Sequence, residues 1–175
     1  MTAQEAYELT TQGGATDFAR VIATCEAFGP YCLIGGLAVN CFVEPVYTLD
    51  ADLVVIASNL ESVAAKLADQ GFKTEMHPHS LNAGGPESEL RIQFTTDERY
   101  QSFLSRATAA EVLGVRVRIA CLEDVTQGKL WAYNDPKRRL SKRKKDELDL
   151  IRLAEAYPHL MSRYPEELQA QIRRG

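Results

Sequence analysis

Two aspartates separated by one residue, Asp50 and Asp52, are the side chains in this sequence best placed to do chemistry. They open an apolar segment that predicts a β-strand over residues 50–57. Because residues two apart in a strand share a face, both carboxylates are expected to project the same way. Like charges this close repel one another unless a cation lies between them. The pair therefore predicts a site for a divalent ion with oxygen ligands, most simply Mg²⁺.

A glycine pair, Gly35 and Gly36, precedes the aspartates with a spacer of thirteen residues. The apolar run Tyr31–Ile34 ends at this pair, as expected of a buried strand that enters a tight turn. Glycine has no Cβ, so the backbone there can take unusual dihedrals and approach a phosphate closely. Residues 37–43 predict a short helix whose first N–H groups would favour an anion at the turn.

Together, the apolar strand, the glycine pair, the spacer and the Asp-x-Asp strand resemble the signature of the polymerase-beta-like nucleotidyltransferase superfamily. The resemblance implies that Gly35 and Gly36 hold the triphosphate of a nucleotide. It also implies that Asp50 and Asp52 are catalytic and hold two Mg²⁺ ions that activate an acceptor hydroxyl. Thr48 stands where the family often has a threonine before its first aspartate. On the residues alone, the alternative is an ordinary strand with exposed aspartates beside a plain glycine loop.

The family takes a third carboxylate from a later strand, and the matching position here is Gln93. Alternation over Leu90–Phe94 predicts a half-buried strand with Arg91 and Gln93 on one face. Glutamine can ligate a metal ion through its carbonyl, but it does not titrate and is a poor general base. Glu89, on the same face, is an alternative acid, and Arg91 would add positive charge near the phosphates. Arg91 and Gln93 are therefore predicted nucleotide-binding residues. Whether the site is catalytically active without a third carboxylate is left undecided by the sequence.

Two later segments, Leu122–Ala132 and Lys145–Leu150, resemble helices of nucleotidyltransferase proteins from bacterial abortive-infection and toxin–antitoxin systems. In those proteins an equivalent lysine helps to hold the nucleotide, and the second helix lines the cleft. The resemblance implies that Lys129 binds the nucleotide and that an antitoxin protein is a partner. The residues alone allow a solvated lysine at position 129. They equally allow charges on a helix surface at Lys145, Asp146 and Asp149.

Residues 137–145 carry seven basic side chains in nine positions, although the whole chain has a net charge of −4. Such a cluster could bind a phosphodiester backbone, such as that of a transfer RNA, through ionic contacts. The only aromatic residues near it for base stacking are Trp131 and Tyr133. The alternatives are a solvated helix start and a site for an acidic protein. The seven residues are Lys137, Arg138, Arg139, Lys142, Arg143, Lys144 and Lys145.

The cysteines and the apolar runs of the sequence indicate where in the cell this protein is located. The four cysteines, Cys25, Cys32, Cys41 and Cys121, lie in apolar segments without a C-x-x-C pair, which predicts buried free thiols in a reducing cytosol. No apolar run is long enough to span a bilayer, and the N-terminus does not read as a signal peptide. We therefore expect a cytoplasmic protein without a membrane contact.

The order of elements predicts an α/β fold, with a nucleotidyltransferase-like mixed β-sheet flanked by helices and a helical C-terminal extension. Residues 1–121 are expected to form the α/β core, and residues 122–175 a helical region packed on it. Residues 1–14 are expected to be loosely ordered. Thr16 and Asn59 are predicted N-caps, and a hairpin is expected around Gly114.

Residues 77–88 are predicted to form the longest loop. His77 and His79 alternate within it as metal ligands can, but no third ligand stands near them in the sequence. A mobile loop with two histidines is therefore the favoured interpretation.

The main functional hypothesis is a metal-dependent nucleotidyltransferase that moves a nucleoside monophosphate from a nucleoside triphosphate to an RNA or protein acceptor, as a component of a toxin system. The alternative is a catalytically degenerate module of the same fold that binds a nucleotide or a partner. A third hypothesis is an RNA-binding module that depends on the basic segment alone.

Overall fold

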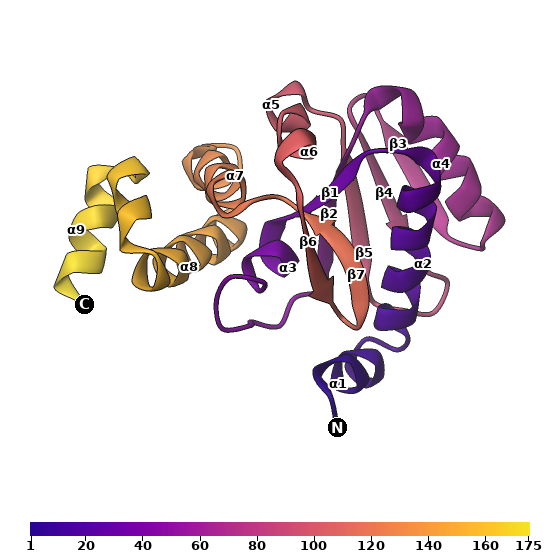
Figure 1. The fold of residues 1–175 in the computed structure, drawn as a ribbon, viewed down its shortest axis with the longest axis horizontal. Helices are drawn as coiled ribbons and strands as arrows, with labels where there is room; N and C mark the ends of the chain where they lie inside the picture. Colours follow the sequence, from indigo (N-terminus) through magenta and orange to yellow (C-terminus); the bar gives the residue numbers. More distant parts are fainter.

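The computed structural model describes residues 1–175 as a seven-stranded mixed sheet flanked by helices (Figure 1). The strands are β1 (Tyr31–Ile34), β2 (Asp50–Val55), β3 (Lys73–His77), β4 (Ser80–Gly84), β5 (Arg91–Thr95), β6 (Thr108–Val112) and β7 (Val115–Ile119). The helices are α1 (Ala3–Thr10), α2 (Gly14–Phe28), α3 (Gly35–Val39), α4 (Ala57–Asp69), α5 (Glu98–Gln101), α6 (Phe103–Arg106), α7 (Leu122–Asn134), α8 (Leu140–Ala156), the 3-10 helix η1 (Pro158–Arg163) and α9 (Glu166–Arg174). The predicted α/β class is confirmed.

The sheet has the strand order β3-β4-β5-β2-β1-β7-β6, with the Asp-x-Asp strand β2 near its middle. Strand β2 pairs antiparallel with β1 and parallel with β5. Strand β1 pairs parallel with β7, and the antiparallel hairpins β3-β4 and β6-β7 form the two ends of the sheet. In this register Asp52 lies between Ile34 on one side and Gln93 on the other.

The two faces of the sheet differ in polarity. Helices α2 and α4 pack together over one face (Figure 1). Alternation along β5 buries Ile92 and Phe94, and leaves Arg91 and Gln93 exposed on the opposite face, as predicted. Leu81 of β4 is buried in the same way. The face opposite α2 and α4 is therefore polar and open over β5 and β4.

The C-terminal helices pack at one side of the sheet. Helix α7 follows β7 closely and packs against α3 and α8. Figure 1 shows α8, η1 and α9 at the end of the molecule away from α2. One hydrophobic core joins the sheet to Leu130, Leu150 and Leu168 of these helices. The boundary between residues 121 and 122 stays a prediction. None of the helices combines the length and apolar character that crossing a lipid bilayer requires.

The expectation of a loose N-terminus is wrong, because residues 3–10 form helix α1. The hydroxyl of Thr2 accepts a hydrogen bond from the amide of Glu5 at 3.1 Å, and the Glu5 carboxylate accepts one from the amide of Thr2 at 2.7 Å. This capping box satisfies the first free N–H groups of the helix. The buried Tyr7 then donates its hydroxyl to the carbonyl of Thr48 at 2.8 Å, which ties α1 to the start of β2.

The long loop predicted over residues 77–88 is also wrong, because residues 80–84 form strand β4 between β3 and β5. Leu81 and Ala83 of β4 alternate as buried residues, but Asn82, Gly84 and Gly85 beside them are residue types that usually indicate a loop. His77 ends β3 and lies 3.5 Å from Glu75, whereas His79 is in the turn. The hairpin predicted around Gly114 is confirmed, with positive φ at Leu113 and Gly114.

Three predicted helix starts are displaced. Helix α2 begins at Gly14, so Thr16 lies within it and donates its hydroxyl to Glu8 at 2.5 Å. Helix α4 begins at Ala57, and the Asn59 side chain donates instead to the carbonyl of Phe28. Helix α3 covers residues 35–39 rather than 37–43, so it begins at the glycine pair itself.

Candidate functional site

A cleft of about 940 Å³ lies between the polar face of the sheet and helices α7 and α8. Every site residue predicted from the sequence lines it, although they come from four separate parts of the chain. These residues are Gly35, Gly36, Asp50, Asp52, Arg91, Gln93 and Lys129. The fold therefore brings the predicted glycine, acidic and basic groups into one cavity.

The two glycines of the turn have different structural requirements. Gly35 has φ +72°, and a Cβ there would lie 2.2 Å from Oδ2 of Asp52. A Cβ on Gly36 would meet nothing closer than Thr48, at an ordinary 3.6 Å. Gly35 is thus fixed by its backbone conformation and by the aspartate packed on it. Gly36 lines the cleft, and a Cβ there would make only this ordinary contact with Thr48.

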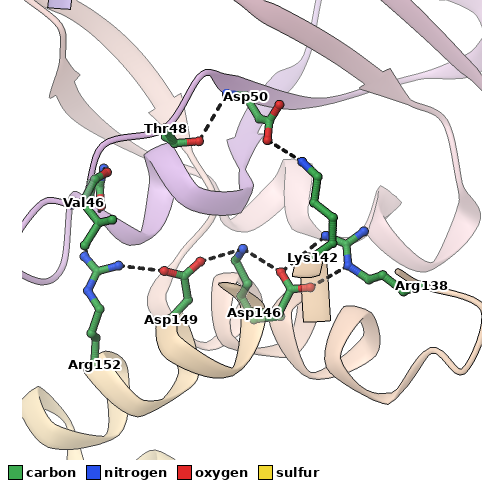
Figure 2. A network of polar contacts seen from close by, with 10 residues as sticks. Val46, Thr48, Asp50, Arg138, Lys142, Asp146, Asp149 and Arg152 are labelled. Carbon is green, nitrogen blue, oxygen red and sulfur yellow. Dashed lines mark hydrogen bonds and ion pairs between the residues drawn. The ribbon is translucent and has the colours of Figure 1, made fainter. Parts of the chain in front are cut away.

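Asp50 is held by cations on both oxygens. Its Oδ1 lies 2.8 Å from Nε of Arg91, on the neighbouring strand β5, and its Oδ2 lies 2.7 Å from Nζ of Lys142, on helix α8. Its amide donates to the hydroxyl of Thr48 at 3.2 Å, which helps to fix the start of β2 (Figure 2). Burial opposes ionisation of Asp50, but Lys142 and Arg91 outweigh it and lower the pKa of the carboxyl.

Asp52 is in a different electrostatic environment. It is half-buried against the Gly35 turn and has no direct ion pair. Burial raises the pKa of Asp52, and the nearby charge of Asp50 adds to the shift, while Lys129 and Lys142 oppose it. Asp50 and Asp52 therefore differ. Asp50 is neutralised by two protein cations, whereas the charge of Asp52 is not balanced by a direct ion pair.

The register of β2 and β5 confirms that Gln93 lies next to Asp52, where the resemblance places a third carboxylate, and that Arg91 lies next to Asp50. The alternative acid, Glu89, does not reach the cleft. Its amide donates to the carbonyl of Thr11 at 2.9 Å, and its carboxylate accepts from Gln12 at 3.3 Å. The suggestion that Glu89 could replace the missing acid is therefore wrong, because the chain turns toward α1 before β5 begins.

Lys129 is not a solvated lysine. Its side chain is 11% exposed, and its ammonium lies 3.0 Å from Asp146 and 2.8 Å from Asp149. Burial opposes the charge, but the two carboxylates raise the pKa of Lys129. Arg138 also binds Asp146, and Arg152 binds Asp149 at 2.7 Å (Figure 2). Asp146 and Asp149 are thus buried members of a charge network, which contradicts the interpretation as helix-surface charges.

Lys145 is exposed but lines the cleft. The other members of the basic segment are divided between two sides of α8. Arg138 and Lys142 face the cleft, whereas Arg143 and Lys144 line a smaller groove of about 280 Å³. Lys137 and Arg139 are exposed at the start of the helix. The basic residues therefore line two different cavities, and Arg138 and Lys142 are already paired with Asp146 and Asp50.

Sequence reasoning missed Arg152 and Asn40, which close the far end of the network. Arg152 donates to the Asn40 side chain at 3.1 Å and to the carbonyl of Glu44. It also missed Tyr100, which lies at the cleft wall against Gly128. None of these residues belongs to a motif, and the partners of Arg152 on the core lie more than a hundred residues away in sequence. Only the tertiary fold could reveal them.

No group of three His, Cys, Asp or Glu side chains is gathered where it could hold a metal ion by itself. The acidic donors at the cleft are Asp50 and Asp52, with the amide carbonyl of Gln93 beside them. Magnesium is commonly held by one or two carboxylates together with substrate phosphates. The donor set therefore fits an ion that is bound jointly by the protein and a nucleotide.

No protein family matches the chain, and no curated protein does so either. Solved structures are similar to it in fold. ANT(2")-Ia in complex with adenylyl-2"-tobramycin is 17% identical, with a TM-score of 0.59, over 91% of this chain and 96% of that one. An antigenic nucleotidyltransferase-like protein from Paracoccidioides brasiliensis is 16% identical, with a TM-score of 0.58, over 91% and 92%. The lincosamide antibiotic adenylyltransferase LnuA, bound to lincomycin, is 16% identical, with a TM-score of 0.51, over 72% and 86%. The chain therefore has the fold of the polymerase-beta-like nucleotidyltransferases, as its glycine pair and Asp-x-Asp strand predict.

Proposed function

We propose that this protein is a metal-dependent nucleotidyltransferase that moves a nucleoside monophosphate from a nucleoside triphosphate to an acceptor in RNA or protein. One observation carries the proposal. Asp50 and Asp52 project into the same cleft as the Gly35–Gly36 turn, within a fold shared with nucleotidyltransferases. The similar structures that adenylate antibiotics support nucleotidyl transfer as the reaction class. Their antibiotic acceptors are not proposed for this protein.

Asp50, Asp52 and the carbonyl of Gln93 would hold Mg²⁺ together with phosphate oxygens of the nucleotide. When bound, the ion would supply neutralisation of phosphate charge and polarisation of the attacking oxygen. The expected two-ion site would have two carboxylates and one amide from the protein, so the nucleotide would provide most of the remaining ligands.

The protein's own cations would stabilise the triphosphate. Lys142 and Arg91, which hold Asp50 in this structure, are within reach of the same space and would pair with phosphate oxygens when an ion takes their place. Lys129 is fixed by Asp146 and Asp149, so it would act through its charge on Asp52 and on the nucleotide rather than by a large movement.

The second candidate is a catalytically degenerate module that binds a nucleotide or a partner. The specific observation in its favour is the amide at Gln93, since no carboxylate replaces it beside Asp52. Binding of RNA by the basic segment alone is less well supported, because that segment is divided between two sides of α8. A role in a toxin system, with an antitoxin protein as partner, and a cytoplasmic location stay predictions.

The test uses nucleoside triphosphates labelled at the α-phosphate, with Mg²⁺ and with cellular RNA and protein as acceptors. We expect the wild type to release pyrophosphate and to transfer label, and the Asp50→Asn and Asp52→Asn variants to lose at least a hundredfold of both. Glu155→Gln is the matched control, because Glu155 is exposed on α8 outside the cleft. Magnesium-dependent binding of a triphosphate without any pyrophosphate release would support the degenerate module instead.

A further inference from the structure

The acceptor side of the cleft consists of two rows of side chains that cross strands β2, β5, β4 and β3 in register. The first row is Asp50, Arg91, Gly84 and Lys73, and the second is Asp52, Gln93, Asn82 and Glu75. All eight residues line the cleft. Helices α7 and α8, which carry Lys129, Asp146 and Asp149, form the opposite wall. The two rows on the sheet are therefore the surface on which an acceptor would lie beside the two aspartates.

The first row contains a notch with a positively charged residue on each side. Gly84 lies between Arg91 and Lys73 and has no side chain to fill the space between them. Neighbouring strands are about 4.8 Å apart, so the backbones that carry the two cations are roughly 10 Å apart. That gap accommodates one tetrahedral anion between a guanidinium and an ammonium. The amides of Gln93 and Asn82, in the adjacent row, add hydrogen-bond donors beside it.

The same surface lacks a group that could take a proton from an attacking hydroxyl. Next to Asp52 stands Gln93, which does not titrate. Glu75 is three strands from Asp52, roughly 14 Å at the usual strand spacing, which is too far for it to act on the same oxygen.

The acids of the opposite wall are all engaged by cations. Asp124 is bound by Arg106 at 2.8 Å, and Asp146 and Asp149 belong to the network of Lys129. Asp52 has no ion pair, but the proposed function assigns it to the metal ion, and no other carboxylate on either wall is both free of a cation and close enough to act as a general base.

We propose that the acceptor is a phosphate monoester, which binds in the notch between Arg91 and Lys73 and is already ionised when it attacks. This inference rests on the proposed nucleotidyl transfer. An oxygen of the monoester forms a bond to the α-phosphorus of the triphosphate, and the bond from that phosphorus to the β-bridging oxygen breaks. Pyrophosphate leaves with the electron pair of the broken bond. No proton is transferred, and the product contains a new phosphoanhydride.

A phosphate monoester can belong to a small molecule or to the 5′ end of an RNA, and the test separates the two. Each acceptor is offered in a matched pair: ribose 5-phosphate against ribose, and an RNA with a 5′-phosphate against the same RNA with a 5′-hydroxyl. We expect label on the phosphorylated member of at least one pair, more than tenfold above its dephosphorylated twin, in a linkage that resists alkaline phosphatase. The pair that responds identifies the source.

Variants connect the result to the notch. Gly84→Val fills the space without changing charge, and the nearest atom to a Cβ there is the carbonyl of Leu90 at 3.8 Å, so the fold should tolerate it. Lys73→Gln removes the one of the two cations that has no part in the proposed triphosphate site. Both should lose at least tenfold of the transfer to the phosphorylated acceptor. Both should also weaken binding of ribose 5-phosphate, measured by calorimetry in EDTA without nucleotide.

Gln93→Glu should favour the hydroxyl acceptors over the phosphorylated ones. It places a titratable group beside Asp52 and negative charge beside the notch. The control is Gln127→Glu, which makes the same change on α7 outside the cleft, next to Arg163. Equal or better labelling of the hydroxyl acceptors by the wild type would overturn the inference and leave the proposed nucleotidyl transfer standing. Absence of pyrophosphate release with every acceptor would instead refute the proposed function itself.

Discussion

Nζ of Lys142 lies 2.7 Å from Oδ2 of Asp50, so helix α8 is joined directly to the Asp-x-Asp strand (Figure 2). With Arg91 on Oδ1, protein cations thus engage both oxygens of Asp50. Any ion must compete with Lys142 for that carboxylate, and the lysine released in this way is free to bind a phosphate.

Lys142→Met should therefore tighten the binding of a divalent ion in the absence of nucleotide. An ion pair of this partial exposure is worth on the order of 1 kcal/mol, which corresponds to about a fivefold lower Kd for Mn²⁺. Titration of Mn²⁺ followed by electron paramagnetic resonance measures it. Lys144→Met is the control, because Lys144 lies on the same helix but pairs with Glu147 and lines the smaller groove. Unchanged Mn²⁺ affinity in Lys142→Met would mean that the ion does not compete for Asp50.

The two glycines of the turn should respond differently to a methyl group. In Gly35→Ala the new Cβ meets Asp52 at 2.2 Å and the backbone stays at φ +72°, so we expect a loss of about 2 kcal/mol or more in the free energy of unfolding. In Gly36→Ala the new Cβ makes only an ordinary contact with Thr48 and the position is helical, so the change should stay within about 1 kcal/mol. Urea unfolding compares the two variants.

Nucleotide binding completes that comparison. Because Gly36 lines the cleft, a methyl group there should weaken triphosphate binding even though the protein folds normally. If Gly36→Ala binds the triphosphate as well as the wild type does, the glycine pair is a structural turn and not a phosphate site.

The local part of this site could be predicted from the sequence. A short apolar strand, a glycine pair and an Asp-x-Asp segment each indicate the backbone conformation of their own residues. The register of β2 and β5 also agreed with the alternation of Leu90–Phe94. The role of Asp146 could not be predicted in this way. An acid in a charged helix usually faces water, and only the partners Lys129 and Arg138, from other parts of the chain, make its burial favourable.

The β3-β4 hairpin shows a second limit. Strand β4 has only five residues, and its Asn82 and Gly84 are typical of loops, so only its pairing with β3 and β5 identifies it as a strand. Glu89 shows a third. It has the correct parity to share a face with Gln93, but it lies outside β5, and its amide and carboxylate bind the α1–α2 corner. Odd and even positions predict which face of the sheet a side chain is on only for residues that belong to the strand.

The cysteines should differ in reactivity. Burial raises the pKa of Cys25 and of Cys32 to about 12, so almost no thiolate is present at neutral pH. The prediction of a buried thiol is wrong for Cys41 and Cys121, which are only half-buried, although burial raises the pKa of each. Iodoacetamide at pH 7.5, followed by mass spectrometry of the native protein, should modify Cys41 and Cys121 slowly and leave the other two intact. Raising the pH should accelerate the half-buried pair first, and early modification of Cys32 would contradict this order.

Asp146 is the acid whose removal should cost most stability. Its side chain is 1% exposed and binds both Lys129 and Arg138, so Asp146→Asn leaves two cations around a neutral amide in a buried site. Breaking a buried ion pair in this way costs about 3 kcal/mol. Glu155→Gln removes one negative charge from the exposed side of the same helix and should change the free energy of unfolding by less than about 0.5 kcal/mol. Urea unfolding of both variants measures the difference, and equal stabilities would show that the network contributes nothing to holding α7 and α8 together.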